Sequence, residues 1–113
     1  MKVTVLGLGA MGAGMAGNLH RAGHLDQAWN RSSARGQAAA QQHGFDLAAS
    51  AEEAAAQADL VITAVSADQD LIEVIERIAP GMTAGGIVMD TSTVSIDTAR
   101  QAEALLQAGG AEV

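Results

Sequence analysis

The fold is decided by the stretch Val5-Leu6-Gly7-Leu8-Gly9-Ala10-Met11-Gly12, a G-x-G-x-x-G turn that follows the first apolar run of the chain. Residues 2–6 read as a short buried strand, and Met11, Met15 and Leu19 then recur at helical spacing. A strand, a glycine turn and a helix in this order are typical of the start of a dinucleotide-binding βαβ unit. The motif alone is weak evidence, and its place between a strand and a helix makes it specific.

The three glycines of the turn have different expected roles. Gly7 allows the tight turn, Gly9 lets the backbone approach a pyrophosphate, and Gly12 lets the helix pack closely on the strand. The N–H groups at the helix start would face the phosphates. The cofactor-binding residues expected in this loop are Gly7, Leu8, Gly9, Ala10, Met11 and Gly12.

An alternative for the first residues is a signal peptide, because residues 3–19 are nearly uncharged behind Lys2. Six glycines between Gly7 and Gly23, with Asn18 among them, make a poor apolar segment. Leu, Ile and Phe are also too few for a membrane span. The nucleotide-binding loop is therefore the favoured interpretation.

Composition limits the possible partners. The 113 residues suit one domain, and they include no cysteine, which excludes disulfides and thiolate metal sites. Thirteen acidic against six basic residues give a net charge of −7, which argues against nucleic acid and anionic membranes as partners. Any bound phosphate must be held by local donors. Without a convincing export signal, we expect a cytoplasmic protein.

Apolar runs alternate with helical patterns along the whole chain, and residues 1–113 are predicted to form one NAD(P)-binding domain. The predicted strands are residues 2–6, 25–29, 45–48, 60–65 and 86–89. The predicted helices are residues 10–22, 33–43, 51–57, 68–79 and 95–108. Five βα pairs predict an α/β fold, a doubly wound parallel sheet of Rossmann type with three α/β/α layers. A sixth strand is expected to begin at residues 111–113.

The end of the second predicted strand bears on the choice of cofactor. In a dinucleotide fold an Asp or Glu at this place binds the ribose 2′-hydroxyl, whereas an Arg accommodates a 2′-phosphate. The chain has Asn30, Arg31 and Ser32 there, with Arg35 close behind and no carboxylate. This pattern favours NADP, with NAD as the weaker alternative. The alternative interpretation is that Arg31 and Arg35 are solvated charges beside a helix start.

Two blocks of sequence resemble the β-hydroxyacid dehydrogenase family, which includes 3-hydroxyisobutyrate dehydrogenases and tartronate semialdehyde reductases. The first block comprises Gly7-Leu8-Gly9-Ala10-Met11-Gly12, Met15-Ala16, Asn18-Leu19, Gly23-His24 and Trp29-Asn30-Arg31. The second, Asp90-Thr91-Ser92-Thr93-Val94-Ser95, is similar to the family's D-x-S-T-x-S-P loop, with Ile96 in place of the proline. The family shares its nucleotide-binding domain with 6-phosphogluconate dehydrogenase and is related to imine reductases.

The resemblance implies further site residues. Asn30, Arg31 and Ser32 would surround the adenosine ribose or its phosphate. The nicotinamide half would meet Val65, Ser66 and Thr93, and the substrate would meet Ser92 and Thr93. Short hydroxyls can donate to a ribose or carboxylate oxygen without blocking the hydride path. The alternative for Ser92 and Thr93 is a helix N-cap.

The activity implied is hydride transfer between NADP and a small 3-hydroxy acid or its semialdehyde, in a homo-oligomer. The family's catalytic lysine, its glycine-rich substrate loop and its helical domain have no counterpart here, so we expect no catalytic residue in this chain and no turnover by it alone. Lys2 is the only lysine and lies at the start of the first strand. Two alternatives remain: a non-catalytic NADP-binding module, and the cofactor domain of an imine reductase.

The remaining polar residues predict no further chemistry. The histidines His20, His24 and His43 match no metal-ligand spacing, so we expect surface or capping roles and no metal. Asp68 and Asp70 come at a helix start, where carboxylates offset the helix dipole.

Overall fold

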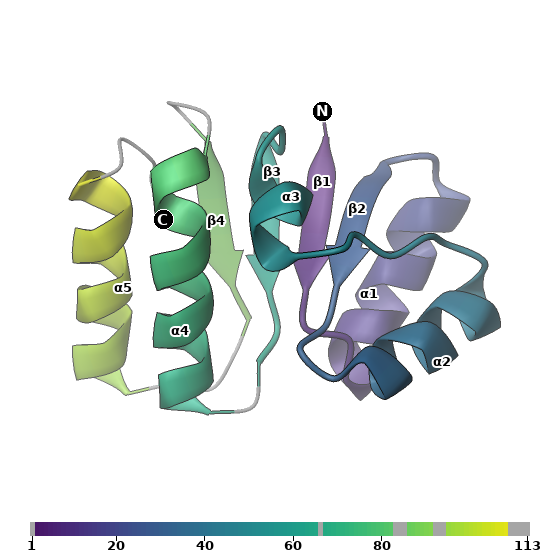
Figure 1. Ribbon diagram of the computed structural model, residues 1–113, viewed down its shortest axis with the longest axis horizontal. Helices are drawn as coiled ribbons and strands as arrows, with labels where there is room; N and C mark the ends of the chain where they lie inside the picture. Colours follow the sequence, from purple (N-terminus) through teal and green to yellow (C-terminus); the bar gives the residue numbers. More distant parts are fainter. Residues whose placement is uncertain (1, 66, 83–85, 92–94, 109–113) are drawn as a thin grey trace.

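The computed structural model describes residues 2–65, 67–82, 86–91 and 95–108 and shows alternating strands and helices (Figure 1). The strands are β1 (Val3–Leu6), β2 (Leu25–Trp29), β3 (Leu60–Thr63) and β4 (Ile87–Asp90). The helices are α1 (Ala10–Arg21), α2 (Ser33–His43), α3 (Ala51–Ala55), α4 (Asp68–Ile78) and α5 (Ile96–Ala108), with a short 3-10 turn η1 (Ala79–Gly81) after α4.

The strands form one parallel sheet in the order β2-β1-β3-β4. Val5 of β1 pairs with Ala28 of β2 on one side and with Ile62 of β3 on the other. Ile62 in turn lies opposite Met89 of β4. The chain moves one way from β1 to β2 and the other way from β2 to β3, so strand order reverses between β1 and β3. In open α/β sheets this switch point is where ligands bind.

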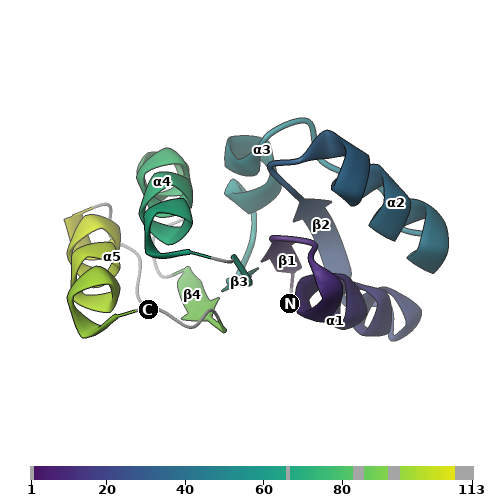
Figure 2. The ribbon, with the colours of Figure 1, turned by 90° about the horizontal axis from the view of Figure 1, so that it is seen from below.

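Side chains alternate across the sheet and separate into two apolar clusters, one on each face. Val5 and Ile62 belong to the cluster that includes residues of α1. Leu6 and Val61 belong to the cluster that includes residues of α3, α4 and α5. Figure 2 shows α1 on one side of the sheet and α3 and α4 on the other. The predicted three-layer, Rossmann-type α/β fold is confirmed.

The position of α4 follows from its apolar stripe. Leu71, Ile75 and Ile78 are buried, at the i, i+4, i+7 spacing that places them on one face of a helix. Because this face packs on the core, the neighbouring face carrying Asp70 and Glu73 lines a pocket beside the sheet. The helix start brings these carboxylates to the carboxyl end of β3.

One predicted strand is wrong: residues 45–48 form no strand, so the sheet has four strands among the described residues. Phe45 is buried in the α1-side cluster, and the Ala48 N–H donates a single hydrogen bond to the Ala28 carbonyl oxygen, 2.8 Å away. The apolar pattern there indicated burial and not a strand ladder. The predicted sixth strand at 111–113 lies outside the described residues.

The boundary of β3 also differs from the prediction. The apolar run 60–65 predicted a longer strand, but β3 ends at Thr63. Ala64 and Val65 leave the sheet and line a pocket, although the Ala64 N–H still donates to the Leu6 carbonyl oxygen at 2.9 Å.

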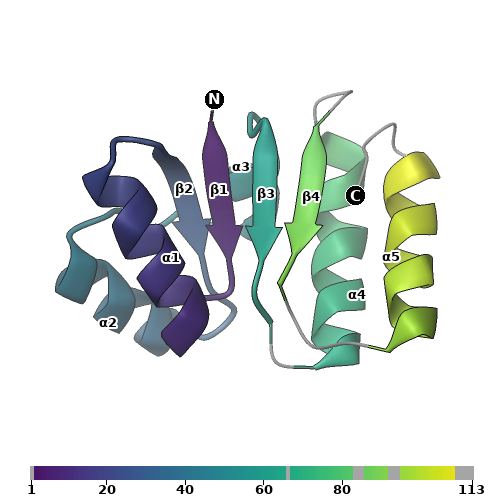
Figure 3. The ribbon, with the colours of Figure 1, turned by 180° about the vertical axis from the view of Figure 1, so that it is seen from behind.

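Among the described elements, no helix lies in front of β3 and β4 on the α1 side of the sheet, as Figure 3 shows. Ile87 and Met89 of β4 are 44% and 45% exposed, whereas Val88 between them is buried. In the described part of the chain, no helix has the length and apolar character needed to cross a membrane.

Candidate functional site

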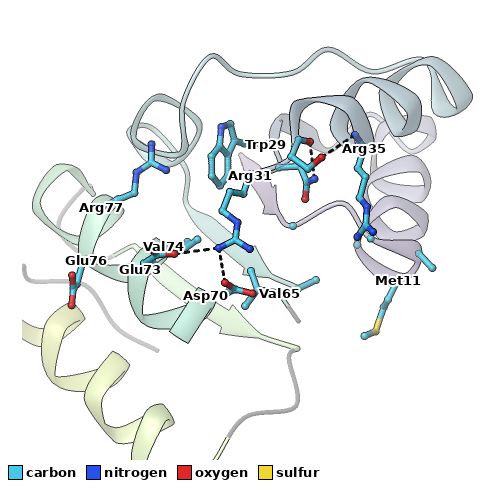
Figure 4. Close-up of a pocket in the computed structure, with 17 residues that line it drawn as sticks. Met11, Trp29, Arg31, Arg35, Val65, Asp70, Glu73, Val74, Glu76 and Arg77 are labelled. Atoms are coloured by element: carbon cyan, nitrogen blue, oxygen red, sulfur yellow. Dashed lines mark hydrogen bonds and ion pairs between the residues drawn. The ribbon is translucent and has the colours of Figure 1, made fainter. Parts of the chain in front are cut away.

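A pocket of about 690 Å³ opens at the carboxyl ends of β1, β2 and β3, with α4 as its far wall (Figure 4). Its lining consists of Gly7, Gly9, Ala10, Met11, Gly12, Trp29, Asn30, Arg31, Ser32, Arg35, Ala64, Val65, Asp70, Glu73, Val74, Glu76 and Arg77. The pocket lies at the switch point of the sheet, the place where this architecture binds ligands.

Two glycines of the loop are required by the protein itself. Gly7 has a φ of 103°, and a Cβ there would lie 2.3 Å from the Ala64 carbonyl oxygen. A Cβ on Gly12 would lie 1.8 Å from the Gly7 carbonyl oxygen. Both clashes are with backbone, which cannot move aside without disturbing the strands. The first and third glycines therefore serve the turn and the close approach of α1.

Gly9 differs because no contact among the described residues requires a glycine at this position. Its φ of −68° and ψ of −170° are open to any residue, and apart from its two chain neighbours a Cβ there would meet no atom of the described residues within 4 Å. Gly9 is also the N-cap of α1, gives the helix no side-chain hydrogen bond, and is followed by no acidic residue in the first turn. The first N–H groups of an α-helix have no partner within the helix, so those at the start of α1 could bind an anion in the pocket.

Asn30 holds the glycine loop in place. Its Oδ1 accepts a hydrogen bond from the Leu8 N–H at 2.8 Å, and its Nδ2 donates to the Ser32 carbonyl oxygen at 2.9 Å. Leu8 itself is buried at 3% exposure and does not line the pocket. Asn30 thus ties the loop after β1 to the loop after β2, which a carboxylate could not do in the same way because it has no N–H donor.

Ser32 and Arg35 lie at the start of α2. The Ser32 Oγ accepts from the Arg35 N–H at 3.4 Å and caps the helix. The Arg35 side chain runs toward the glycine loop in Figure 4. Among the described residues its guanidinium has no ion pair, so it is a cation available to the pocket.

Arg31 reaches across the pocket to α4. Its Nη1 lies 2.7 Å from Asp70 Oδ1 and 3.4 Å from Glu73 Oε2. The Arg31 side chain remains 68% exposed, while that of Asp70 is only 20% exposed. The structure therefore places the predicted phosphate-binding Arg31 against two carboxylates, Asp70 and Glu73, for which the sequence predicted no binding role.

The outer part of the pocket is built on Trp29. The Arg77 guanidinium lies 5.0 Å from the centre of the Trp29 ring, in cation–π geometry, and its Nη2 is 2.7 Å from Glu52 Oε1. A backbone hydrogen bond at Glu52 itself, followed by the Arg77 side chain, lowers the pKa of Glu52. Arg77 is thus already held by a ring and a carboxylate.

The carboxyl ends of β3 and β4 are joined by threonine hydroxyls. Thr63 Oγ1 donates to Asp90 Oδ1 at 2.9 Å, and Thr91 Oγ1 donates to the Thr63 carbonyl oxygen at 2.9 Å. Val65 lines the pocket on this side.

Asp68 links α4 to the start of α5. Its Oδ2 accepts from Thr98 Oγ1 at 3.0 Å and from the Ser95 N–H at 3.4 Å. Side-chain hydrogen bonds from Ser95 and then Thr98 lower the pKa of Asp68. Ser95 itself caps α5, because its Oγ accepts from the Thr98 N–H at 3.2 Å.

Most of the predicted cofactor residues come together in one pocket. Those that line it are Gly7, Gly9, Ala10, Met11, Gly12, Asn30, Arg31, Ser32 and Val65. Leu8 supports the loop from the core, and Ser66, Ser92 and Thr93 lie outside the described residues. Trp29, Ala64 and the pocket face of α4 were not predicted from the sequence. The i, i+3 spacing of Asp70 and Glu73 indicates that they share one face of a helix, but it does not show that this face lines a pocket.

The histidines lie away from this pocket. His43 stacks on Phe45 with ring centres 6.2 Å apart, and His20 meets the edge of Phe45 at 6.3 Å. Within the described ranges, no three His, Asp or Glu side chains gather in a way that could hold a metal ion.

A parallel sheet with a glycine loop at its switch point and an open helix start defines the class of Rossmann-type dinucleotide-binding domains. Residues 2–113 match the family model described as the NAD binding domain of 6-phosphogluconate dehydrogenase, and the chain belongs to this family.

Relatives and solved structures agree with this assignment. The chain is 38% identical to an uncharacterized oxidoreductase of Shewanella frigidimarina, over 94% of this chain and 38% of that protein. The 3-hydroxyisobutyrate dehydrogenase of Mycobacterium tuberculosis, solved with L-serine, superposes with a TM-score of 0.91 at 32% identity. The alignment covers 98% of this chain and 38% of the mycobacterial one, so the chain spans well under half the length of these proteins.

Reductases of carbon–nitrogen bonds are similar too. An imine reductase from Pseudomonas sp. has a TM-score of 0.84 at 30% identity, over 97% of this chain and 38% of that one. A reductive aminase from Aspergillus terreus, in complex with NADPH and ethyl levulinate, has a TM-score of 0.82 at 30% identity with the same coverage. The chain is therefore an NAD(P)-binding domain of the kind found in oxidoreductases.

Proposed function

We propose that this chain binds NADP(H) in an oxidoreductase that transfers a hydride between the nicotinamide and a small 3-hydroxy acid or its semialdehyde. The glycine loop and the N–H groups of the α1 start hold the pyrophosphate. Arg31, Ser32 and Arg35 surround the adenosine ribose and its 2′-phosphate, and Asn30 keeps both loops in register. Val65 flanks the nicotinamide, together with Ser66 and Thr93, while Ser92 and Thr93 meet the substrate.

The observation that carries this proposal is the pairing of an open glycine with guanidinium groups in one pocket. No side chain of the described residues fills the space beside Gly9, and Arg31 and Arg35 line the pocket where the second strand ends. No carboxylate follows β2 directly at the place that would bind a ribose 2′-hydroxyl. A forked guanidinium suits a phosphate dianion.

The residues of this chain hold and orient the cofactor, and the nicotinamide itself supplies the hydride when bound. Similarity to the mycobacterial 3-hydroxyisobutyrate dehydrogenase supports a 3-hydroxy acid as substrate. Similarity to the Aspergillus terreus reductive aminase, whose structure contains NADPH, supports the choice of NADP. A homo-oligomeric assembly and a cytoplasmic location are part of the proposal.

Replacing Arg31 tests the cofactor preference. In the unmodified chain, calorimetry is expected to give tighter binding of NADPH than of NADH. Arg31→Met removes a charged hydrogen bond worth about 1.5–3 kcal/mol, so NADPH should bind roughly 10- to 100-fold more weakly. NADH affinity should change little.

Arg100→Met is the matched control, because it removes the same charge from the exposed surface of α5. It should leave both affinities unchanged. Equal affinity of the unmodified chain for NADPH and NADH would contradict the proposed NADP preference.

A second candidate, the cofactor domain of an imine reductase, is favoured by the similarity to the Pseudomonas structure. Chimeras separate the two: residues 2–113 replace the matching part of either the mycobacterial dehydrogenase or the Pseudomonas enzyme. The dehydrogenase chimera should retain turnover and the imine reductase chimera should lose it. The reverse result favours imine reduction, and two inactive chimeras that still bind NADPH favour a non-catalytic module.

A further inference from the structure

The pocket contains three arginines whose electrostatic surroundings differ. Arg77 is held by Glu52 and the Trp29 ring, and Arg35 has no ion pair among the described residues. Of these three, and counting only described residues, Arg31 is the one paired with carboxylates that line the same pocket, Asp70 and Glu73 of α4. Figure 4 shows both carboxylates pointing at its guanidinium.

The geometry of this cluster leaves Arg31 partly engaged. Both carboxylates contact the same nitrogen, Nη1, at 2.7 and 3.4 Å. The Asp70 side chain is the more buried of the two, at 20% exposure against 57% for Glu73. Asp70 is therefore less screened by water, and its pair with Arg31 is the stronger one. Two negative charges stand within hydrogen-bond range of the group that would meet a 2′-phosphate.

We propose that Asp70 and Glu73 are specificity-determining residues that compete with the 2′-phosphate of NADP for Arg31 and so moderate the preference for NADP over NAD. This inference rests on the proposed function. A phosphate dianion that binds Arg31 must share or displace these carboxylates and is repelled by their charge. The uncharged 2′-hydroxyl of NAD meets no such repulsion, so the carboxylates weaken NADP binding selectively.

Asp70→Asn and Glu73→Gln test this competition by removing one charge at nearly constant shape. Calorimetric dissociation constants for NADPH and NADH are measured for each variant of the 113-residue chain. The ratio of NADPH to NADH affinity should rise about three- to tenfold in Asp70→Asn and less in Glu73→Gln, on the scale of a partly exposed ion pair plus relieved repulsion.

Glu76→Gln is the matched control. Glu76 belongs to the same helix and to the pocket rim, but it has no ion pair with Arg31 and points away from it in Figure 4. Its loss changes the net charge equally, and it should alter the affinity ratio by less than about twofold, since a rim charge at longer range is screened. A rise in the affinity ratio equal to that of Asp70→Asn would mean that net charge alone causes the effect, and it would overturn the inference.

A double mutant isolates Arg31 as the carrier of the effect. In the Arg31→Met background, Asp70→Asn should no longer raise the affinity ratio. An unchanged or lowered ratio in Asp70→Asn alone would overturn the competition while leaving NADP binding intact. Failure of the unmodified chain to bind either dinucleotide would instead overturn the proposed function, and this inference with it.

Discussion

At the scale of single residues, the three loop glycines separate into two kinds. Gly7 and Gly12 are surrounded by backbone atoms at distances no Cβ could tolerate, so the fold itself demands them. Gly9 has ordinary dihedral angles, and within the described ranges nothing but its chain neighbours lies within 4 Å of its Cβ position. Because Gly9 also lines the pocket, this open space is available to a ligand.

Gly9→Val should abolish dinucleotide binding and leave the fold nearly intact. The valine side chain enters the space reserved for the pyrophosphate, and as a poorer N-cap it should lower the free energy of unfolding by only about 1 kcal/mol. Calorimetry and thermal melting of the same sample check both parts. Normal binding by this variant would show that the loop is not a phosphate site.

Gly12→Ala is the comparison variant with the opposite signature. Its new methyl group overlaps the Gly7 carbonyl oxygen, so the free energy of unfolding should fall by about 3 kcal/mol or more. Loss of stability to the same degree in Gly9→Val would contradict the open geometry at that position.

At the scale of elements, the joint between α4 and α5 depends on one carboxylate. Asp68 accepts hydrogen bonds from Ser95 and Thr98 across the two helix starts, and these bonds hold the pKa of Asp68 below its usual value. A carboxyl group whose pKa is lower in the folded chain stabilises the fold above the unfolded-state pKa of 3.8. This contribution is lost as the pH falls through the folded-state pKa.

Asp68→Asn should therefore lower the melting temperature at pH 7, and the gap to the unmodified chain should narrow as the pH falls below 3.8 and through the lower pKa of folded Asp68. Melting curves by circular dichroism from neutral to acid pH measure this. Asp46→Asn, at an exposed carboxylate outside helices and strands, controls for net charge and should follow the unmodified chain. An identical pH profile for both variants would show that Asp68 does not stabilise the contact between α4 and α5.

At the scale of the whole molecule, the pocket and the only lysine lie at opposite ends of the sheet. Lys2 precedes β1, where its Nζ donates to Gln57 Oε1 at 3.2 Å and its backbone N–H donates to Asp59. The pocket opens at the carboxyl ends of the strands. Lys2 is therefore badly placed for proton transfer near a bound nicotinamide.

The 113-residue chain by itself should bind NADPH weakly and show no turnover. Loss of general acid–base help alone costs about 100- to 10,000-fold in rate. Purified chain is tested with NADP(H) and 3-hydroxyisobutyrate, methylmalonate semialdehyde or tartronate semialdehyde, after calorimetry has shown that the sample binds the cofactor. Turnover that survives repeated purification would require a proton donor within these residues.

Local pattern was enough to predict the parallel α/β fold, the glycine loop and the polar end of β2, because each is carried by residues close in sequence. The strand predicted at 45–48 was wrong because local pattern shows only that Phe45 is buried. A buried residue has the same pattern in a loop as in a strand, and strand pairing depends on residues far away in the sequence. The α4 wall of the pocket was missed because a helix pattern shows which residues share a face, not what that face meets.

The sequence by itself determined which residues could turn, cap and bury, and hence the order of strands and helices and the place of a phosphate loop. Only the tertiary structure decided that Arg31 meets Asp70, 39 residues away in the chain. It also decided that Gly9 is open while Gly12 is not. The physical reason is that charge pairing and steric exclusion act through space, and the switch point brings the ends of β1, β2 and β3 to one pocket.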